Sequence, residues 1–280
     1  MILVTGATGT VGSDVVRLLV EAKANVRAMT RDPSKAKLPP GVEVVKGDFD
    51  DPASLAAATR GIEKMFLLAV GPNLAQAEAR ALAAAKANGV KHAVKISTFG
   101  AAKPDIAISK WHRSGEEQLE ASGLAWTHLR PSGFMSNAMA WVGSIKKAGS
   151  VFGGIGDVKS APIHPTDIAA CAVAALLKSG HENKAYGLTG GELLSMQEQC
   201  SILGEIIGKP VKYVNLPEEK LRESMLAAGR PAALVDGVIE LQRAIRASGG
   251  APKTDEVKNL TGREPLKWSH WCHEHKAAFI

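Results

Sequence analysis

A glycine-rich turn near the start of the chain limits its fold more than any other sequence feature. Gly6, Gly9 and Gly12 follow the apolar segment 2–5 and open the amphipathic segment 12–22. Glycines at this spacing let the backbone turn sharply and leave the N–H groups of a helix N-terminus free for a phosphate. Between a strand and a helix, such a turn indicates a dinucleotide-binding α/β fold, and a tight turn without a ligand is the alternative.

The hydrophobic pattern of the first half of the chain agrees with this interpretation. Apolar segments alternate with helical segments of about ten or more residues, which predicts a doubly wound parallel sheet. The predicted strands are 2–5, 25–30, 42–46, 64–69, 93–97 and 125–129. The predicted helices between them include 12–22, 75–88 and 111–122.

The regular alternation stops near Arg130 and predicts a second, smaller part of the molecule. We expect an NAD(P)-binding Rossmann domain over 1–150, with the helix 164–179 packed against it. We expect a smaller C-terminal α/β substrate-binding lobe over 185–280. Its predicted helices are 195–207, 218–228 and 232–247.

Composition excludes several classes of protein. The chain has 280 residues, is 45% hydrophobic and carries a net charge of +6. Its lysines and arginines form no dense run, so we expect an anion-attracting cleft or a scattered surface excess rather than nucleic-acid binding. No apolar run approaches the ~20 residues that span a bilayer, so no membrane partner is expected. The three scattered cysteines and the lack of a signal segment favour the cytoplasm.

The end of the second predicted strand bears on the choice between NAD and NADP. An NAD site usually has an acidic residue there for the ribose 2′-hydroxyl, whereas this chain has Thr30 and Arg31. A guanidinium pairs well with a 2′-phosphate, so the sequence favours NADP(H) and leaves NAD(H) as the alternative. Asp32 comes next and is expected to cap the following short helix.

The G-x-x-G-x-x-G spacing resembles the short-chain dehydrogenase/reductase superfamily, but the usual Tyr-x-x-x-Lys of that superfamily is missing. The chain has two tyrosines, Tyr186 and Tyr213, and neither precedes a lysine at this spacing. In the equivalent helix, His112 is the main candidate for contact with cofactor or substrate, and Lys110 is a weaker one. Ser97 ends the fifth predicted strand, where the superfamily often has a serine beside the nicotinamide. For His112 and Ser97 a purely structural role is the alternative.

Several longer motifs resemble the NmrA-like atypical short-chain reductases. They are the glycine turn, Arg31-Asp-Pro, Gly47-Asp48-Phe49, Gly89-Val90-Lys91-His92, the run from Glu116 to Pro131, and Gly180–Tyr186. Together they extend over about two thirds of the chain. Within the family, the chain is similar to flavin-free quinone oxidoreductases of type 2, triphenylmethane dye reductases and flavin-free azoreductases.

This resemblance implies a flavin-free NADPH-dependent oxidoreductase that transfers hydride to a small planar or conjugated acceptor, such as a quinone or azo dye. It implies that His112 and Ser97 are catalytic and that these residues bind cofactor: Gly6, Thr8, Gly9, Thr10, Val11, Gly12, Arg31, Asp48, Ala69, Val70, Gly71, Pro131 and Phe134. The family also contains regulators that bind a dinucleotide without turnover, so a redox sensor is the alternative. The oligomeric state is left open, with a homodimer as one alternative.

Two segments, one rich in apolar residues and one rich in histidine, each allow two interpretations. Phe134, Met135, Met139 and Trp141 follow the predicted nicotinamide side, where they would form either a floor for a planar substrate or ordinary packing of the lobe. The tail 268–275 holds three histidines and a cysteine, but their spacing matches no common zinc site. We expect a helix that packs its tryptophans there and no metal.

Overall fold

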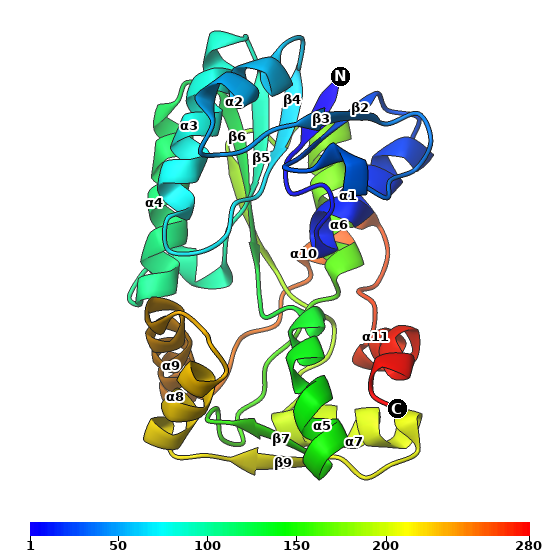
Figure 1. Cartoon of the computed structure of the whole chain (residues 1–280), viewed down its shortest axis with the longest axis vertical. Coiled ribbons are helices and arrows are strands. Elements are labelled where there is room, and N and C mark those ends of the chain that lie inside the picture. Colours follow the sequence, from blue (N-terminus) through cyan, green and yellow to red (C-terminus); the bar gives the residue numbers. More distant parts are fainter.

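A computed structural model describes residues 1–280, with a seven-stranded sheet in the larger part and a smaller lobe below it (Figure 1). All strands of the sheet pair in parallel, in the order β3-β2-β1-β4-β5-β6-β8. They are β1 (Ile2–Val4), β2 (Val26–Thr30), β3 (Glu43–Lys46), β4 (Lys64–Leu67), β5 (His92–Ile96), β6 (Ala125–Pro131) and β8 (Lys184–Leu188). The predicted doubly wound Rossmann sheet is therefore confirmed.

Helices cover both faces of this sheet. One face carries α1 (Thr10–Glu21), α6 (Pro165–Leu177) and α10 (Glu256–Thr261), and the other carries α2 (Pro52–Thr59), α3 (Leu74–Ala87) and α4 (Ala107–Ala121). Side chains alternate between the faces of a strand, so Ile2 and Val4 enter one core and Leu3 the other. None of the helices combines the length and the apolar character that crossing a bilayer would take.

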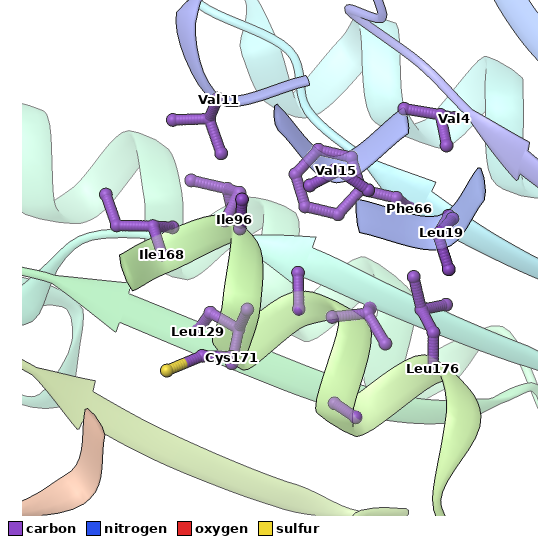
Figure 2. Packing of buried hydrophobic residues seen from close by; sticks show 14 of the residues in the cluster. Val4, Val11, Val15, Leu19, Phe66, Ile96, Leu129, Ile168, Cys171 and Leu176 are labelled. Atoms are coloured by element: carbon purple, nitrogen blue, oxygen red, sulfur yellow. The ribbon is translucent and has the colours of Figure 1, made fainter. Parts of the chain in front are cut away.

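The core on the α1 face fixes the start of the chain against the sheet. Val11, Val15 and Leu19 recur at every fourth position of α1 and point toward α6 (Figure 2). Ile168, Cys171 and Leu176 of α6 face them, and Phe66, Ile96 and Leu129 of the sheet complete the contact in the same view. The amphipathic pattern of 12–22 thus has the role that its period predicts.

The smaller lobe has its own core beneath the sheet. Its elements are α5 (Val142–Ala148), β7 (Ser150–Gly153), α7 (Met196–Ile207), β9 (Lys212–Asn215), α8 (Glu218–Ala227), α9 (Ala232–Ala247) and α11 (Trp268–His275). The short 3-10 helices of the chain are η1 (Pro33–Lys35), η2 (Phe99–Ala102), η3 (Met135–Trp141) and η4 (Lys276–Ala278). The helix predicted at 195–207 is confirmed, and it begins with a capping box in which Ser195 and Glu198 bond each other's backbone N–H groups.

The chain passes between the Rossmann domain and the smaller lobe more often than domain boundaries at residues 150 and 185 predict. β8 lies after residue 180 yet pairs with β6, and Val257 and Leu260 of α10 pack in the core of the sheet. Conversely, Met135 and Ile145 belong to the core of the lobe. The sequence did not predict β7, β8 or β9; in β8 only the last residue, Leu188, is buried, so no hydrophobic alternation marks this strand.

One helix starts earlier than its sequence predicts. α4 begins at Ala107 instead of residue 111, because the carboxylate of Glu240 on α9 accepts the Ala107 N–H at 3.0 Å. Gly237 of α9 lies against Ile108, so the two helices meet closely at this point. A cap supplied from another part of the chain leaves no local sequence signal.

Candidate functional site

The strand order reverses between β1 and β4, and sheets of this kind bind ligands beyond the carboxyl ends of their strands at such a point. The glycine turn follows β1 and the segment Ala69–Gly71 follows β4, so the fold brings these two predicted segments together. Thr5 connects them, because its Oγ1 accepts the Leu68 N–H at 2.9 Å. The most specific sequence motif thus lies where this fold places ligands.

The turn itself depends on glycine at two positions. Gly6 has a positive φ of 61°, and its carbonyl oxygen accepts the Gly9 N–H at 2.9 Å. A Cβ on Gly12 would lie 2.1 Å from the oxygen of Gly6. Only glycine permits this approach of strand end and helix start, and it leaves the outer side of the turn open for a ligand.

The N-terminus of α1 has unpaired N–H groups to offer. Gly9 is the N-cap, no side chain caps the helix, and no acidic residue lies in its first turn. Thr8, Gly9 and Thr10 are exposed, whereas the Val11 side chain is 2% exposed and packs in the core. Val11 can therefore reach a ligand only through its backbone. The arrangement suits an anion, since the helix dipole is positive here.

The end of β4 presents an apolar side chain beside the turn. Val70 is 83% exposed, which is unusual for a valine in a folded chain, while Ala69 before it is buried. Gly71 follows with a φ of 93°, a conformation that favours glycine. An exposed valine at this position can cover an apolar ring of a bound ligand.

The residues that would distinguish NADP from NAD lie at the ends of β2 and β3. Arg31 is exposed and makes no hydrogen bond within the chain. Asp32 caps the short helix after it, accepting the Ser34 N–H at 3.2 Å and pairing with Lys35 at 2.9 Å. The capping role predicted for Asp32 is confirmed. The Asp48 carboxylate also caps its own turn, accepting the Asp50 N–H at 3.0 Å.

The ends of β5 and β6 form the other side of the site. Ser97 is 3% exposed, and its hydroxyl, although near the Glu116 carboxylate, has no partner at hydrogen-bonding geometry. Pro131 is buried at the end of β6, and Phe134 is half-buried against the sheet core and pairs with Ile163. An unpartnered buried hydroxyl at a strand end is expected to find its partner in a ligand or water.

His112 lies on α4, the helix that follows β5. Its Nδ1 is buried without a hydrogen-bond partner, and the ring makes no other hydrogen bond within the chain. Burial and then the nearby Lys95 ammonium lower the pKa of His112 to about 3. The ring is therefore neutral at physiological pH and carries one N–H.

The sequence did not predict a buried ion pair that lies behind His112. Lys95 of β5 and Glu78 of α3 are both 0% exposed, and Lys95 Nζ lies 2.9 Å from Glu78 Oε1. The sequence held a signal for it, because a lysine in the apolar strand Ala93-Val-Lys-Ile96 must find a partner when buried.

Groups that often carry catalysis elsewhere are engaged or buried here. The Tyr186 hydroxyl lies 2.9 Å from Nδ1 of His181, and the Tyr213 hydroxyl accepts the Ile155 N–H in the lobe. The three cysteines, Cys171, Cys200 and Cys272, are buried, and burial raises their thiol pKa values to about 12. The chain therefore holds no activated thiol and no free tyrosine at the site.

The segment 134–141 and the tail 268–275, which each allowed two interpretations, mainly have a packing role in the structure. Met135 is 2% exposed in the lobe core, and Trp141 packs against Trp268. Met139 is 42% exposed and remains a candidate for substrate contact. The tail forms α11, in which Trp268 and Trp271 stack at 5.1 Å, as its predicted packing role requires.

Comparison with known proteins decides the family. The sequence model of the NAD(P)H-binding family matches residues 6–179 of the chain. This chain belongs to the NAD(P)H-binding family. The predicted resemblance to NmrA-like reductases is confirmed.

Similar proteins are known by reductase names. The chain is 39% identical to an NAD(P)H azoreductase of Xenophilus azovorans, over 100% of the chain and 99% of that protein. It is 37% identical to a (4-alkanoyl-5-oxo-2,5-dihydrofuran-3-yl)methyl phosphate reductase of Streptomyces griseus, over 100% of the chain and 99% of that protein. The Escherichia coli quinone oxidoreductase QOR2, solved with NADPH, superposes with a TM-score of 0.88 at 28% identity, covering 98% of this family member and 99% of QOR2.

Replacing Gly12 with alanine tests the turn. The new Cβ would lie 2.1 Å from the Gly6 oxygen, so the turn must open. We expect a cost on the order of 1–3 kcal/mol in stability and at least a tenfold loss of NADPH affinity, measured by thermal unfolding and calorimetric titration. Gly143→Ala is the matched control, because a Cβ there meets nothing within 4 Å. An unchanged NADPH affinity in Gly12→Ala would show that the turn does not hold the cofactor.

Proposed function

We propose that the chain is a flavin-free, NADPH-dependent reductase that transfers hydride to a small conjugated acceptor such as a quinone or an azo compound. The observation that carries the proposal is the glycine turn, which offers unpaired N–H groups at the switch point of the sheet. The names of the similar proteins support the reaction class, since azo, quinone and unsaturated lactone compounds all hold conjugated double bonds.

The residues around the turn fit a dinucleotide. In this proposal the pyrophosphate lies against the backbone of Gly6–Gly12, with the exposed Thr8 and Thr10 at its sides. Asp48 and Ala69–Gly71 line the adenosine side, and Ser97, Pro131 and Phe134 line the nicotinamide side. The absence of a Cβ at Gly12 lets the start of α1 pack closely on the end of β1, which is the role of the third glycine in such a dinucleotide turn.

The choice of NADP(H) rests on Arg31. Asp32 is occupied in its helix cap, so it is not free to hold a ribose 2′-hydroxyl. The neighbouring Arg31 is exposed and makes no contact that would compete with a 2′-phosphate. A planar guanidinium binds such a phosphate with two charge-assisted hydrogen bonds.

The chain needs little acid–base chemistry of its own for this reaction. When bound, a reduced nicotinamide supplies a hydride, and the acceptor then takes one proton from solvent, so that a quinone becomes a hydroquinone. The protein's task is to hold the acceptor against the cofactor and to polarise it. His112 is the residue for the second task, because its neutral ring can donate a hydrogen bond to the acceptor.

We further propose that the smaller lobe covers the acceptor. Met139 lies on η3, which follows β6 in the chain, and its exposed side chain offers an adaptable apolar contact. The buried, unreactive cysteines are compatible with a reducing compartment such as the cytoplasm.

Turnover is the direct test of this function. Purified protein without added flavin is expected to oxidise NADPH in the presence of a quinone or an azo dye, followed by the loss of NADPH absorbance. A variant with Gly12→Ala is expected to lose this activity. Tight NADPH binding without oxidation by any acceptor of the panel would instead support a non-catalytic redox sensor.

The Arg31→Ala variant tests the cofactor preference. We expect KM for NADPH to rise about tenfold to a hundredfold, as the loss of a charge-assisted pair of roughly 1.5–3 kcal/mol implies. KM for NADH should change little, because NADH has no 2′-phosphate. Arg230→Ala, in the exposed loop after α8, serves as the control. An equal rise for both cofactors would contradict the role given to Arg31.

A further inference from the structure

The ion pair between Lys95 and Glu78 is built into the wall behind the proposed hydride site. Lys95 precedes Ile96 and Ser97 at the carboxyl end of β5, and Glu78 reaches it from α3. Both side chains are fully buried, and Lys95 Nζ lies 2.9 Å from Glu78 Oε1; burial raises the pKa of Glu78 to about 7 even beside the ammonium. A buried ion pair costs desolvation and often stabilises a fold less than apolar residues would. This cost is a reason to look for a role in the site.

Helix α4 is shaped to accept this pair. A Cβ on Gly115 would lie 2.2 Å from Glu78 Oε2 and 2.9 Å from Lys95 Cε, so any larger residue would push the two side chains aside. His112 lies three residues before Gly115 and shares its face of the helix. The same contact that seats α4 on Lys95 therefore places His112 on the helix face toward this lysine, whose charge acts on the ring.

Hydrogen-bond accounting leaves one donor, the third N–H of Lys95, and two acceptors, Glu78 Oε2 and His112 Nδ1, without partners at this point. Lys95 Nζ donates to Glu78 Oε1 at 2.9 Å and to the Ile96 carbonyl at 2.8 Å, which uses two of its three N–H groups. Nδ1 of His112 is buried and has no partner. Buried polar groups of native proteins are nearly always paired, directly or through a water.

We propose that Lys95 is a positioning residue whose third N–H is bonded, directly or through one water, by Nδ1 of His112. Nδ1 then accepts, so the proton of the neutral ring resides on Nε2. His112 is thereby fixed as a donor toward the acceptor, and the buried positive charge of Lys95 strengthens that donor as negative charge develops on the acceptor. Glu78 and the Ile96 carbonyl hold the ammonium in place.

This inference rests on the proposed function and names the part of the site that replaces the missing tyrosine. A tyrosine hydroxyl needs a partner that lowers its pKa, whereas a neutral imidazole needs one that selects its tautomer. Two further charged groups lie near: Glu116, one turn along α4, and Glu240, which caps the start of that helix. Glu116 is neutralised by Arg130 at 2.7 Å and Arg113 at 2.9 Å. Glu240 accepts the Ala107 N–H at the start of the helix, and the two charges that act on the His112 ring are those of Lys95 and Glu116.

Nuclear magnetic resonance of the ring nitrogens tests the assignment without reference to activity. In protein labelled with ¹⁵N-histidine, the His112 signals are identified by their loss in His112→Gln. We expect a neutral ring protonated at Nε2 in the wild-type protein, with and without NADP⁺. A ring protonated at Nδ1, or a cationic ring at neutral pH, would overturn the proposal whether or not the protein turns out to be a reductase.

Substitutions can distinguish the positioning of His112 by Lys95 from a role of the ion pair in packing alone. Lys95→Met combined with Glu78→Leu replaces the pair by apolar side chains of similar size and avoids an uncompensated buried charge. We expect this variant to fold, to bind NADPH as before, and to lose the preference for the Nε2 tautomer. Leu119→Ala, which opens a cavity under the same helix but keeps the ammonium, should retain the tautomer. Loss of the tautomer in Leu119→Ala alone would contradict the proposal.

A double-mutant cycle gives the kinetic readout. In the wild-type background, removal of the pair should lower kcat about tenfold or more while KM for NADPH stays unchanged. In the His112→Gln background it should lower kcat no further, because a glutamine amide donates from a similar position and has no tautomer to select. Equal losses in both backgrounds would show that the pair acts only on packing. Absence of turnover in every variant, with the NMR result intact, would count against the proposed function alone.

Discussion

The close approach of Gly6 and Gly12 is the contact on which the site depends. A Cβ at Gly12 would lie 2.1 Å from the Gly6 oxygen, so any other residue would separate the end of β1 from the start of α1. With glycine there, Val11 and Val15 can reach the core against α6 (Figure 2), while the N–H groups of Thr10 and Val11 at the start of the helix stay free. One steric constraint thus serves both the packing of α1 and the binding of a dinucleotide.

On the opposite side of the site, buried ion pairs between strands and helices hold the elements in place. Lys95 and Glu78 join β5 to α3, and Arg130 and Glu116 join β6 to α4. Arg130 holds the Glu116 carboxylate by two hydrogen bonds and, although burial alone would raise it, keeps the pKa of Glu116 at about 2. These pairs fix α4, and with it His112, against the ends of β5 and β6. Buried ion pairs and their hydrogen bonds thus fix the geometry on this side of the site.

The sheet and the cofactor side of the site could be predicted from the sequence more completely than the catalytic side. The glycine turn and Arg31 are local motifs, so their positions follow from the order of strands. The pairing of Lys95 with Glu78 joins residues 17 positions apart, and the start of α4 depends on Glu240 from a distant helix. β8 was missed because its exposed first residues, Lys184 and Ala185, hide the alternation of a strand. Contacts made only in three dimensions leave no such local pattern.

The crystal structure of the protein with NADP⁺ tests the central claim most directly. The account predicts the pyrophosphate against the N–H groups of Thr10 and Val11, the 2′-phosphate within hydrogen-bond reach of Arg31, and the nicotinamide between Ser97 and His112. A dinucleotide bound in the reverse direction, or with its 2′-phosphate away from Arg31, would contradict it.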